Sequence, residues 1–535
     1  MRRWNGWGDD SIDLQLAAGA RKYLNAQIGD GAAPIDVALD AALAGIPPSR
    51  LPDCRLVIRD PEARLRASVG QSLEDWLRLR FGRVGALVDG VAYPETEQDV
   101  RDVFAWAVKA GAVVIPVGGA TSVVGHLTPG DGERPSLAIP MTRLRRLLEL
   151  DATSQLASFE AGVAGPDLEA QLRAHGFVLG HYPQSFEYST LGGWIATRSC
   201  GQQSARYGRI EALFAGGRVE TPAGALDLPA FPASAAGPDL KEWVLGSEGR
   251  IGIITRATVR VSRAPERETF VGYFLPGWDA GRAATRELAQ GRIGLSMMRL
   301  ANAAETEATL RLAGGGAGVA ALERYLAWRG CGEGKVLLIV GYTGSGAEVD
   351  AERARAKDVL RRRGAVSAGA LVGGKWRASR FKSAYLRNAL WAAGYAVDTM
   401  ETAVDWTRAD AMTRAIETAG RAALARFGER CHAQTHLSQV YPQGSSVYST
   451  FVFRIAPDFE TNLERWRALK GAVSDAIVNK GGTITHQHGV GKDHALYLAV
   501  EKGDLGARAL QAMIDHFDPS GALDSGNLLP KDPRR

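Results

Sequence analysis

Residues 116–122 read PVGGATS and follow directly on the apolar run VVI at 113–115. The run predicts a short strand, and the paired glycines at its end permit backbone angles and close approaches that other residues resist. Successive N–H groups of such a turn can converge on a pyrophosphate. We therefore interpret this stretch as a phosphate-binding loop, with a plain glycine-rich turn between two strands as the alternative.

The loop does not have the form of a Rossmann site. The GxGxxG motif of that site opens a helix directly, whereas residues 123–132 read VVGHLTPGDG, which predicts an irregular loop. The lysine of a P-loop is absent as well. We do not expect a nicotinamide cofactor bound in the Rossmann manner, and we expect His126 in this loop to be structural rather than a covalent flavin anchor.

Two further stretches contain paired or clustered glycines. Residues 189–201, STLGGWIATRSCG, place them at a predicted helix start, with Thr197 and Arg198 available to an anion. Residues 246–254, GSEGRIGII, place Glu248 and small residues just before an apolar strand. Three glycine-rich turns at strand ends within one α+β block indicate a surface that is wrapped along an extended dinucleotide.

Composition excludes several classes of protein. The 535 residues are 45% hydrophobic and 23% charged, with a formal charge of +5 and a pI near 9.0. No basic block resembles a nucleic-acid arm, and a mild positive field favours an anionic substrate. The N-terminus is no secretory signal, and no apolar run could span a bilayer. The four cysteines are scattered, so we expect reduced thiols and a cytoplasmic protein.

The order of predicted elements divides the chain into four parts and indicates an α+β fold. Residues 1–85 form an alanine-rich helical segment, and 86–264 form a cofactor domain. Residues 265–455 alternate strand and helix more loosely, as expected for an inserted substrate domain. Residues 456–535 begin with a helix and return to the cofactor site.

Residues 483–488, TITHQH, follow two glycines at the end of a predicted helix. Their β-branched content predicts a short strand, in which His486 and His488 share one face and Gln487 points the other way. Two imidazoles on one face suit proton transfer or metal ligation. No carboxylate or cysteine beside them completes a ligand set, so we expect no metal. A structural histidine pair at a strand end is the plain alternative.

The glycine-bearing stretches, taken together, resemble the FAD-binding domain of the vanillyl-alcohol oxidase type. Within that superfamily, WNGWG, DTMETAVDW, SVYSTFVF and THQHGVGK follow the order of the alkyldihydroxyacetonephosphate synthase family. The resemblance covers nearly the whole chain. It implies a two-part FAD-binding domain with an inserted α+β cap domain over the isoalloxazine ring.

The resemblance also implies which residues hold FAD. Two of them depart from the family pattern: Gln184 replaces an acidic residue and Ala120 replaces a glycine, and both changes are compatible with FAD binding. The implied residues are Pro116, Val117, Gly118, Gly119, Ala120, Thr121, Ser122, Gln184, Ser185, Ser189, Thr190, Gly193, Ala196, Thr197, Arg198, Ser199, Glu248, Gly249, Gly252, Ile253 and Ile254.

The family's reaction is redox-neutral and belongs to ether lipid synthesis. A base removes a proton from C1 of acyl-dihydroxyacetone phosphate, an adduct forms at flavin N5, and a long-chain alcohol replaces the acyl group. Tyr448 corresponds to the tyrosine base, whose pKa cations must lower from about 10. Arg387 corresponds to the substrate arginine, since guanidinium binds phosphate through parallel hydrogen bonds. Arg299, within an apolar run, must be paired or line a site, and the family has an arginine near the flavin there.

His486 and His488 correspond to the outer members of a histidine triplet, with Gln487 in the middle place. The resemblance implies that the two histidines line the flavin site and transfer protons, with Arg299 also in the catalytic site and Gln487 in contact with substrate. Glutamine can hydrogen bond but carries no proton at neutral pH. This departure keeps open an FAD-dependent oxidase or dehydrogenase of a hydroxy acid or alcohol. A flavin-binding protein without turnover is a third hypothesis. The resemblance is also compatible with a lipid substrate, a peripheral membrane contact and a homodimer.

Overall fold

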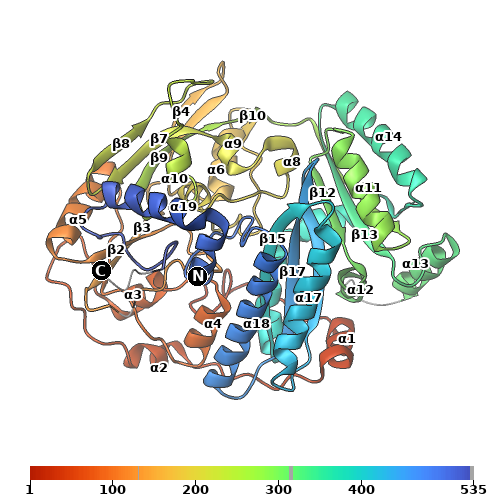
Figure 1. Ribbon diagram of the computed structural model, residues 1–535, viewed down its shortest axis with the longest axis horizontal. Coiled ribbons are helices and arrows are strands. Elements are labelled where there is room, and N and C mark those ends of the chain that lie inside the picture. The colour runs from red at the N-terminus through yellow and green to blue at the C-terminus, as the bar shows by residue number, and fades with distance from the viewer. Residues whose placement is uncertain (131, 313–316, 531–535) are drawn as a thin grey trace.

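The computed structural model describes residues 1–130, 132–312 and 317–530. Figure 1 shows two bodies side by side: the segments coloured orange to yellow form one, and the green to cyan segments form the other. The last helix, in dark blue, returns to the first body. Within the described residues, no helix is long and apolar enough to cross a bilayer.

The N-terminal segment is helical, as its alanine-rich pattern predicts, and is interrupted around the PPSRLPD stretch. It contacts the predicted phosphate loop directly. Arg2 Nη2 donates to the carbonyl of Ala120 at 3.0 Å, and the N–H of Gln71 donates to the carbonyl of Ser122 at 2.6 Å. Its helices are α1 (Ala18–Ile28), α2 (Leu39–Ala44), α3 (Pro61–Ala67) and α4 (Leu73–Arg80).

The next part contains a parallel sheet of order β1-β3-β2 and an antiparallel sheet of order β4-β5-β9-β7-β8. The strands are β1 (Gly90–Val91), β2 (Val113–Val117), β3 (Ser136–Pro140), β4 (Leu147–Asp151), β5 (Leu156–Glu160), β7 (Phe214–Thr221), β8 (Gly224–Leu228) and β9 (Ile253–Arg260), with the small pair β6 (Phe177–Val178) and β10 (Ser262–Arg263) beside them. The helices are α5 (Glu97–Lys109), α6 (Gly165–Arg173), α7 (Leu191–Ala196), α8 (Ser204–Tyr207), α9 (Ile210–Leu213) and α10 (Lys241–Val244).

Periodicity explains these elements. In α5, apolar residues at helical spacing form the buried face: Val100, Val103, Phe104 and Ala107. Thr96 caps that helix, because its side chain accepts the N–H of Asp99 at 3.1 Å. In β9, residues that alternate in the sequence are alternately buried, as in a half-buried strand, and β7 pairs with β8 as a hairpin.

The inserted part contains a seven-stranded antiparallel sheet of order β14-β11-β13-β12-β16-β17-β15. Its strands are β11 (Arg267–Leu275), β12 (Met297–Ala301), β13 (Val336–Gly344), β14 (Val366–Ser367), β15 (Tyr395–Asp405), β16 (His432–Val440) and β17 (Gly444–Arg454). Its helices are α11 (Trp278–Gln290), α12 (Ala303–Leu312), α13 (Ala317–Trp328), α14 (Gly346–Arg362), α15 (Gly369–Ser379), the 3-10 turn η1 (Lys382–Tyr385), α16 (Leu386–Ala392) and α17 (Ala409–Ala425).

The two faces of this sheet differ. One face packs under α11, α14, α17 and the long helix α18 (Phe459–Asn479) through an apolar cluster that includes Phe451 and Phe453. Because side chains alternate along a strand, Tyr448 and Glu401 lie on the opposite face. That face is apolar near both ends of the sheet and polar between them. It therefore supplies a polar wall in the middle of the molecule.

The chain then returns to the cofactor-binding part. Helix α19 (Ala495–Phe517) packs there through Leu498 and Ile514. Beyond it, the carbonyl of Ala522 accepts the N–H of Val114 at 2.6 Å, at the strand that precedes the glycine loop. The C-terminal segment thus contributes to the surroundings of that loop.

Candidate functional site

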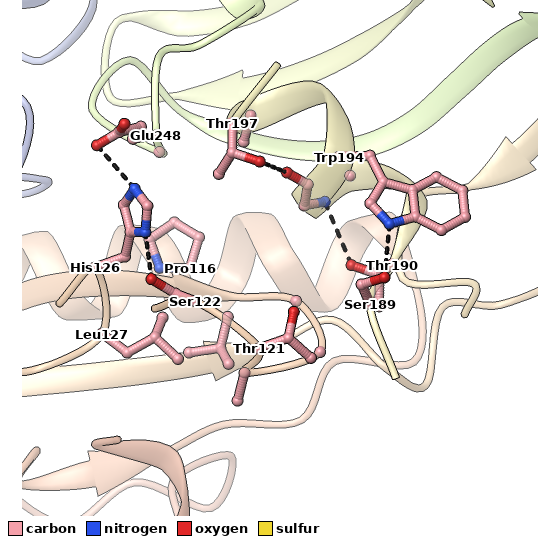
Figure 2. Close-up of a pocket in the computed structure, with 18 of the residues that line it drawn as sticks. Pro116, Thr121, Ser122, His126, Leu127, Ser189, Thr190, Trp194, Thr197 and Glu248 are labelled. Atoms are coloured by element: carbon pink, nitrogen blue, oxygen red, sulfur yellow. Dashed lines mark hydrogen bonds and ion pairs between the residues drawn. The ribbon is translucent and has the colours of Figure 1, made fainter. Parts of the chain in front are cut away.

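A cavity lies where the glycine-bearing stretches meet, and Figure 2 shows part of its wall. It has about 1250 Å³ of empty volume, partly open to solvent. Nineteen of the predicted FAD residues line it: Pro116, Val117, Gly118, Gly119, Ala120, Thr121, Ser122, Ser185, Ser189, Thr190, Gly193, Ala196, Thr197, Ser199, Glu248, Gly249, Gly252, Ile253 and Ile254. Gln487 and His488 from the returning segment line it as well.

Two predicted FAD residues lie elsewhere. Among the described residues, neither Gln184 nor Arg198 is part of the cavity wall. Gln184 instead donates to Ser383 Oγ at 3.1 Å, toward the inserted part. Arg198 turns outward from a backbone with φ of 53° and pairs with Glu242 at 2.9 Å. The sequence placed both in the right segment, but the local turn directs their side chains away.

The glycine loop is built for close approach. A Cβ on Gly119 would overlap the carbonyl of Tyr188, and one on Gly118 would lie 2.5 Å from Thr190 Oγ1. Thr190 also caps α7, accepting the N–H of Gly193 at 3.3 Å. In the described part of the chain, the N–H groups of residues 118–122 have no protein acceptor. Backbone donors therefore remain free beside the cavity.

His126, which we expected to be structural, belongs to the cavity wall. Its Nδ1 lies 2.5 Å from Ser122 Oγ, and its Nε2 lies 3.0 Å from Glu248 Oε2 (Figure 2). Burial alone would lower the pKa of His126, but the charge and hydrogen bond of Glu248 outweigh it and raise that pKa. Glu248 also accepts the N–H groups of Val490 at 2.5 Å and Gly491 at 2.9 Å, so it joins three cavity segments.

The His–Gln–His segment is a loop, so the predicted strand is wrong. One buried oxygen, Glu401 Oε1, accepts the N–H groups of His486 at 2.9 Å, Gln487 at 2.7 Å and His488 at 2.9 Å. It also accepts the hydroxyl of Thr485 at 2.9 Å. Three consecutive N–H groups can converge on one atom only if the backbone curls around it. Strand alternation therefore does not apply, and Gln487 faces the cavity.

The two histidines have different surroundings. His486 Nε2 lies 2.7 Å from Arg209 Nη1 and 2.7 Å from the hydroxyl of Tyr441. Because a guanidinium only donates, this Nε2 carries no proton, and Nδ1 faces Glu401 Oε2 at 3.5 Å. Among the described residues, His486 is not part of the cavity wall, whereas His488 is.

Tyr448 meets His488 just behind the cavity wall. Their rings stand edge to face with 5.5 Å between centroids, and the other face of Tyr448 stacks on His436 at 4.8 Å. Burial raises the pKa of Tyr448 to about 12 and lowers the pKa of His488 below its ordinary value. The charge of Arg387 lowers the pKa of Tyr448 as expected, but burial outweighs it, so the net shift of this pKa is upward rather than downward.

Arg299 is paired, one of the two outcomes that its apolar setting allowed. It forms an ion pair with the buried Glu305, whose other oxygen lies 2.9 Å from His436 Nδ1. Although burial opposes it, the charge of Arg299 helps lower the pKa of Glu305 to about 2. Within the described residues, Arg299 does not line the cavity. It reaches Tyr448 only through His436.

Arg387 is half-buried rather than a solvated helix residue. Its guanidinium lies 4.3 Å from the ring centre of Trp76, and Nη1 donates to the carbonyl of Gln71 at 2.7 Å. Its positive charge favours ionisation of Tyr448. In the described part of the chain, its remaining N–H groups have no acceptor. Arg387 can therefore offer several donors close to the tyrosine.

The cavity fits FAD. Free backbone donors suit a pyrophosphate, and the glycines leave room that any side chain would fill. Gln487 Oε1 is buried and without a partner among the described residues, so a ligand N–H can satisfy it. Within the same residues, no cluster of three or more histidine, cysteine or acidic side chains could hold a metal ion.

Comparisons with known proteins agree with this site. Residues 88–227 match the family described as FAD binding domain, and 264–528 match FAD linked oxidases, C-terminal domain. The alkyldihydroxyacetonephosphate synthase of Trypanosoma brucei brucei is 31% identical over 483 residues, which cover 89% of this chain and 78% of that protein. The chain belongs to the alkyldihydroxyacetonephosphate synthase family. FAD is its cofactor, and the fold is the two-part FAD-binding domain with an inserted cap.

A solved structure of an alkyldihydroxyacetonephosphate synthase supports this membership. It superposes on this chain with a TM-score of 0.83 at 26% identity, and the match covers 99% of this chain and 98% of that chain. An uncharacterized FAD-linked oxidoreductase of Escherichia coli (strain K12) is 25% identical and covers 74% of this chain and 80% of its own. Proteins named as FAD-linked oxidoreductases are therefore also similar to this chain, at lower identity.

Sequence reasoning missed several residues of this site. The hydrogen-bonding and stacking partners of the predicted residues were not found: Arg209, Glu305, Glu401, His436 and Tyr441. Glu401 and Glu305 are buried carboxylates, and Glu401 lies in β15, a mostly buried strand that alternates polar and apolar residues. The rule applied to Arg299, that a buried charge must be paired, applies to Glu401 as well once its burial is known.

Proposed function

We propose that this protein is an FAD-dependent, redox-neutral alkyl transferase of ether lipid synthesis. It replaces the acyl group of acyl-dihydroxyacetone phosphate with a long-chain alcohol and releases the fatty acid. Family membership supports the reaction class. The structural observation that supports it best is the contact between Tyr448 and His488, because this contact joins a half-buried phenol to an imidazole in the FAD cavity.

Proton transfer is the task of this pair. His488 is neutral and can accept the proton of Tyr448, and the charge of Arg387 favours the resulting phenolate. The phenolate then takes a proton from C1 of the substrate. When bound, FAD supplies an electrophilic N5 to the substrate carbon. His436 stacks on the far face of the phenol and keeps it oriented.

Arg387 binds the substrate phosphate in this proposal. The Gln71 carbonyl and the Trp76 ring fix its guanidinium, so two parallel N–H groups can meet two phosphate oxygens. Gln487 lies at the cavity and hydrogen bonds substrate or flavin through an amide that cannot transfer a proton. His486 is held by Arg209 and Tyr441 and supports the loop.

The flavin absorbance of the anaerobic protein tests the reaction. We expect acyl-dihydroxyacetone phosphate to bleach the flavin and a fatty alcohol to restore the colour with no electron acceptor present. The alternative is a dehydrogenase or oxidase, which the E. coli relative makes a real competitor. It predicts bleaching with a hydroxy acid or alcohol and recovery only with oxygen or a dye, and that result would overturn the proposal.

A cytoplasmic location, a peripheral membrane contact and a homodimer complete the proposal. Long-chain substrates partition into bilayers, so an enzyme that consumes them gains from transient contact with a lipid surface. Co-sedimentation with phosphatidylcholine vesicles tests the contact, and light scattering during size-exclusion chromatography tests the dimer. A monomer that does not co-sediment with vesicles, with or without substrate, would contradict both the membrane contact and the homodimer.

A further inference from the structure

One buried side chain, Glu401, contacts every residue of the loop 485–488 on the wall of the FAD cavity. Glu401 projects from β15, directly opposite Tyr448 of β17 in the sheet register. Its Oε1 receives four hydrogen bonds of 2.7–2.9 Å from this loop, three of them from consecutive backbone N–H groups. Only 3% of Glu401 is exposed, so water does not replace these contacts. We propose that Glu401 is the positioning residue that sets this loop against the FAD cavity and orients its two histidines.

Geometry supports the role of Glu401 in placing the loop against the cavity. The loop has no ladder of hydrogen bonds to a neighbouring strand within the described residues. Removal of Glu401 would leave the N–H groups of His486 and Gln487 without their acceptor, at a cost of about 1–3 kcal/mol each, and would leave the N–H of His488 with only the 3.2 Å bond to Thr485 Oγ1. Gln487 and His488 are the loop residues on the cavity wall. Displacement of the loop would therefore disturb flavin binding before any chemistry takes place.

Charge supports the effect of Glu401 on the two histidines. Glu401 Oε2 faces His486 Nδ1 at 3.5 Å, and Oε1 lies 3.7 Å from His488 Nδ1. Burial opposes ionisation of Glu401, yet the pKa of its carboxyl is well below the ordinary value, because both histidines and the loop N–H groups stabilise the carboxylate. A fixed negative charge beside His488 raises the proton affinity of the cavity imidazole.

Besides Glu401, other titratable groups face His488 and must stay in place during the test. They come from β15, β17, α18, the loop itself and the start of α19: Asp398, Tyr448, Lys470, His486 and His494. Burial has the largest influence and lowers the pKa of His488. The charges of Lys470 and His486 lower this pKa further, whereas those of Glu401 and Asp398 raise it. Removal of the Glu401 charge alone should therefore lower this pKa further.

Glu401→Gln and Glu401→Ala separate shape from charge. A glutamine oxygen can accept the same loop N–H groups but is neutral, whereas alanine removes both. We expect Glu401→Gln to keep its FAD Kd within about threefold of the parent and to lower the His488 titration midpoint. We expect Glu401→Ala to weaken FAD binding by at least about tenfold, the equivalent of 1.4 kcal/mol. Flavin fluorescence quenching measures the FAD Kd. NMR of 13C-labelled histidine measures the His488 titration midpoint, and the His488 signal is assigned by its loss in His488→Asn.

Glu501→Gln is the matched control. Glu501 holds the start of the same segment, accepting the hydroxyl of Thr483 at 2.8 Å and the N–H of Ile484 at 3.2 Å. Its neutralisation should leave the FAD Kd and the His488 titration unchanged. A His488 midpoint in Glu401→Gln equal to the parent, or parental FAD affinity in Glu401→Ala, would overturn the proposal.

Thr485 keeps the test decisive if the Glu401 variants fail to fold. Thr485→Ala removes one bond to Oε1, together with the 3.2 Å bond from the His488 N–H to Thr485 Oγ1, and leaves the carboxylate charge in place. FAD binding should weaken by a few-fold while the His488 titration stays parental, and Thr485→Ser should restore the affinity. Parental affinity in Thr485→Ala would contradict the role of this oxygen. The inference rests on the proposed function for the role of His488. Neither the FAD affinity nor the His488 titration depends on turnover. A protein that does not form ethers would therefore contradict the proposed function and leave the role of Glu401 standing.

Discussion

The ring of Tyr448 stands edge-on to that of His488, with 5.5 Å between centroids and 83° between planes. On its other side it stacks on His436, with 16° between planes. A half-buried phenol that packs between two imidazoles cannot turn away from the cavity without repacking both rings. In the proposed reaction, this fixed ring would set where a proton leaves the substrate.

Tyr448→Phe removes the phenol and keeps the packing. We expect kcat for ether formation to fall by about 10² to 10⁴-fold, the usual contribution of a positioned acid–base group. FAD affinity should not change, because Tyr448 is not on the described wall of the FAD cavity. Steady-state turnover and flavin titration measure the two effects.

Tyr395→Phe is the control for this change. Tyr395 lies on β15, which pairs with β17, but its hydroxyl donates to the carbonyl of Gly29 at 2.8 Å, away from the cavity. It should lose about 1 kcal/mol of stability and keep its turnover. Equal turnover in both variants would remove Tyr448 from the reaction.

Gly119→Ala should abolish tight FAD binding. The new methyl group would overlap the carbonyl of Tyr188, so the loop must shift away from it. Overpacking of this kind costs about 1–3 kcal/mol, and we expect the FAD Kd to rise by about ten- to a hundredfold. In Gly132→Ala the methyl group meets nothing within 4 Å, and its Kd should match the parent. A parental Kd in Gly119→Ala would mean that this loop does not hold the cofactor.

Much of the fold could be predicted from local pattern. The spacing of Val100, Val103, Phe104 and Ala107 predicted α5, and the glycine-bearing turns located the cavity. Both follow from local backbone and burial preferences. The order of strands in the seven-stranded sheet does not, because β12 pairs with β13 and β16 across long connections.

The site was predictable only where neighbours in sequence act together. The strand predicted for 483–488 rested on β-branched residues, but Glu401, more than eighty residues earlier, outweighs that local preference with three hydrogen bonds to backbone N–H groups. The separation of His486 from the cavity likewise depends on Arg209, which is distant in sequence. Such long-range partners leave no periodicity in the chain.

Ala120→Gly should stabilise the protein. Ala120 replaces a glycine of the family pattern and has a φ of 50°, in the left-handed region. That conformation costs an L-residue about 1 kcal/mol relative to glycine, so the variant should gain about that much in free energy of unfolding. FAD affinity should stay equal or improve, because the backbone angle is already the required one. Urea unfolding and flavin titration measure both.

Ala170→Gly gives the opposite sign and serves as its control. Ala170 is an exposed position inside α6, where glycine costs about 1 kcal/mol. A loss of stability in both variants would show that the loop at Ala120 adopts another conformation in solution.

Asp493→Asn should change the pH dependence of stability. Burial raises the pKa of Asp493 to about 6 from 3.8, against the charge of Lys470 at 3.6 Å. The folded state therefore binds this proton more tightly than the unfolded state, so the stabilising contribution is complete at low pH and is lost as pH rises through about 6. The variant lacks this loss, while Lys470 keeps Asp398 as a partner at 3.6 Å.

We therefore expect the stability of Asp493→Asn relative to the parent to increase by about 2 kcal/mol between pH 4.5 and pH 7. Urea unfolding at both pH values measures this difference. Asp405→Asn should behave in the opposite way, because a hydrogen bond from Arg408 lowers the pKa of the exposed Asp405 to about 2. That variant should be less stable than the parent at pH 7 and approach it as pH falls. A pH-independent difference for Asp493→Asn would mean that Asp493 is ionised at both pH values and that its burial is compensated by Lys470.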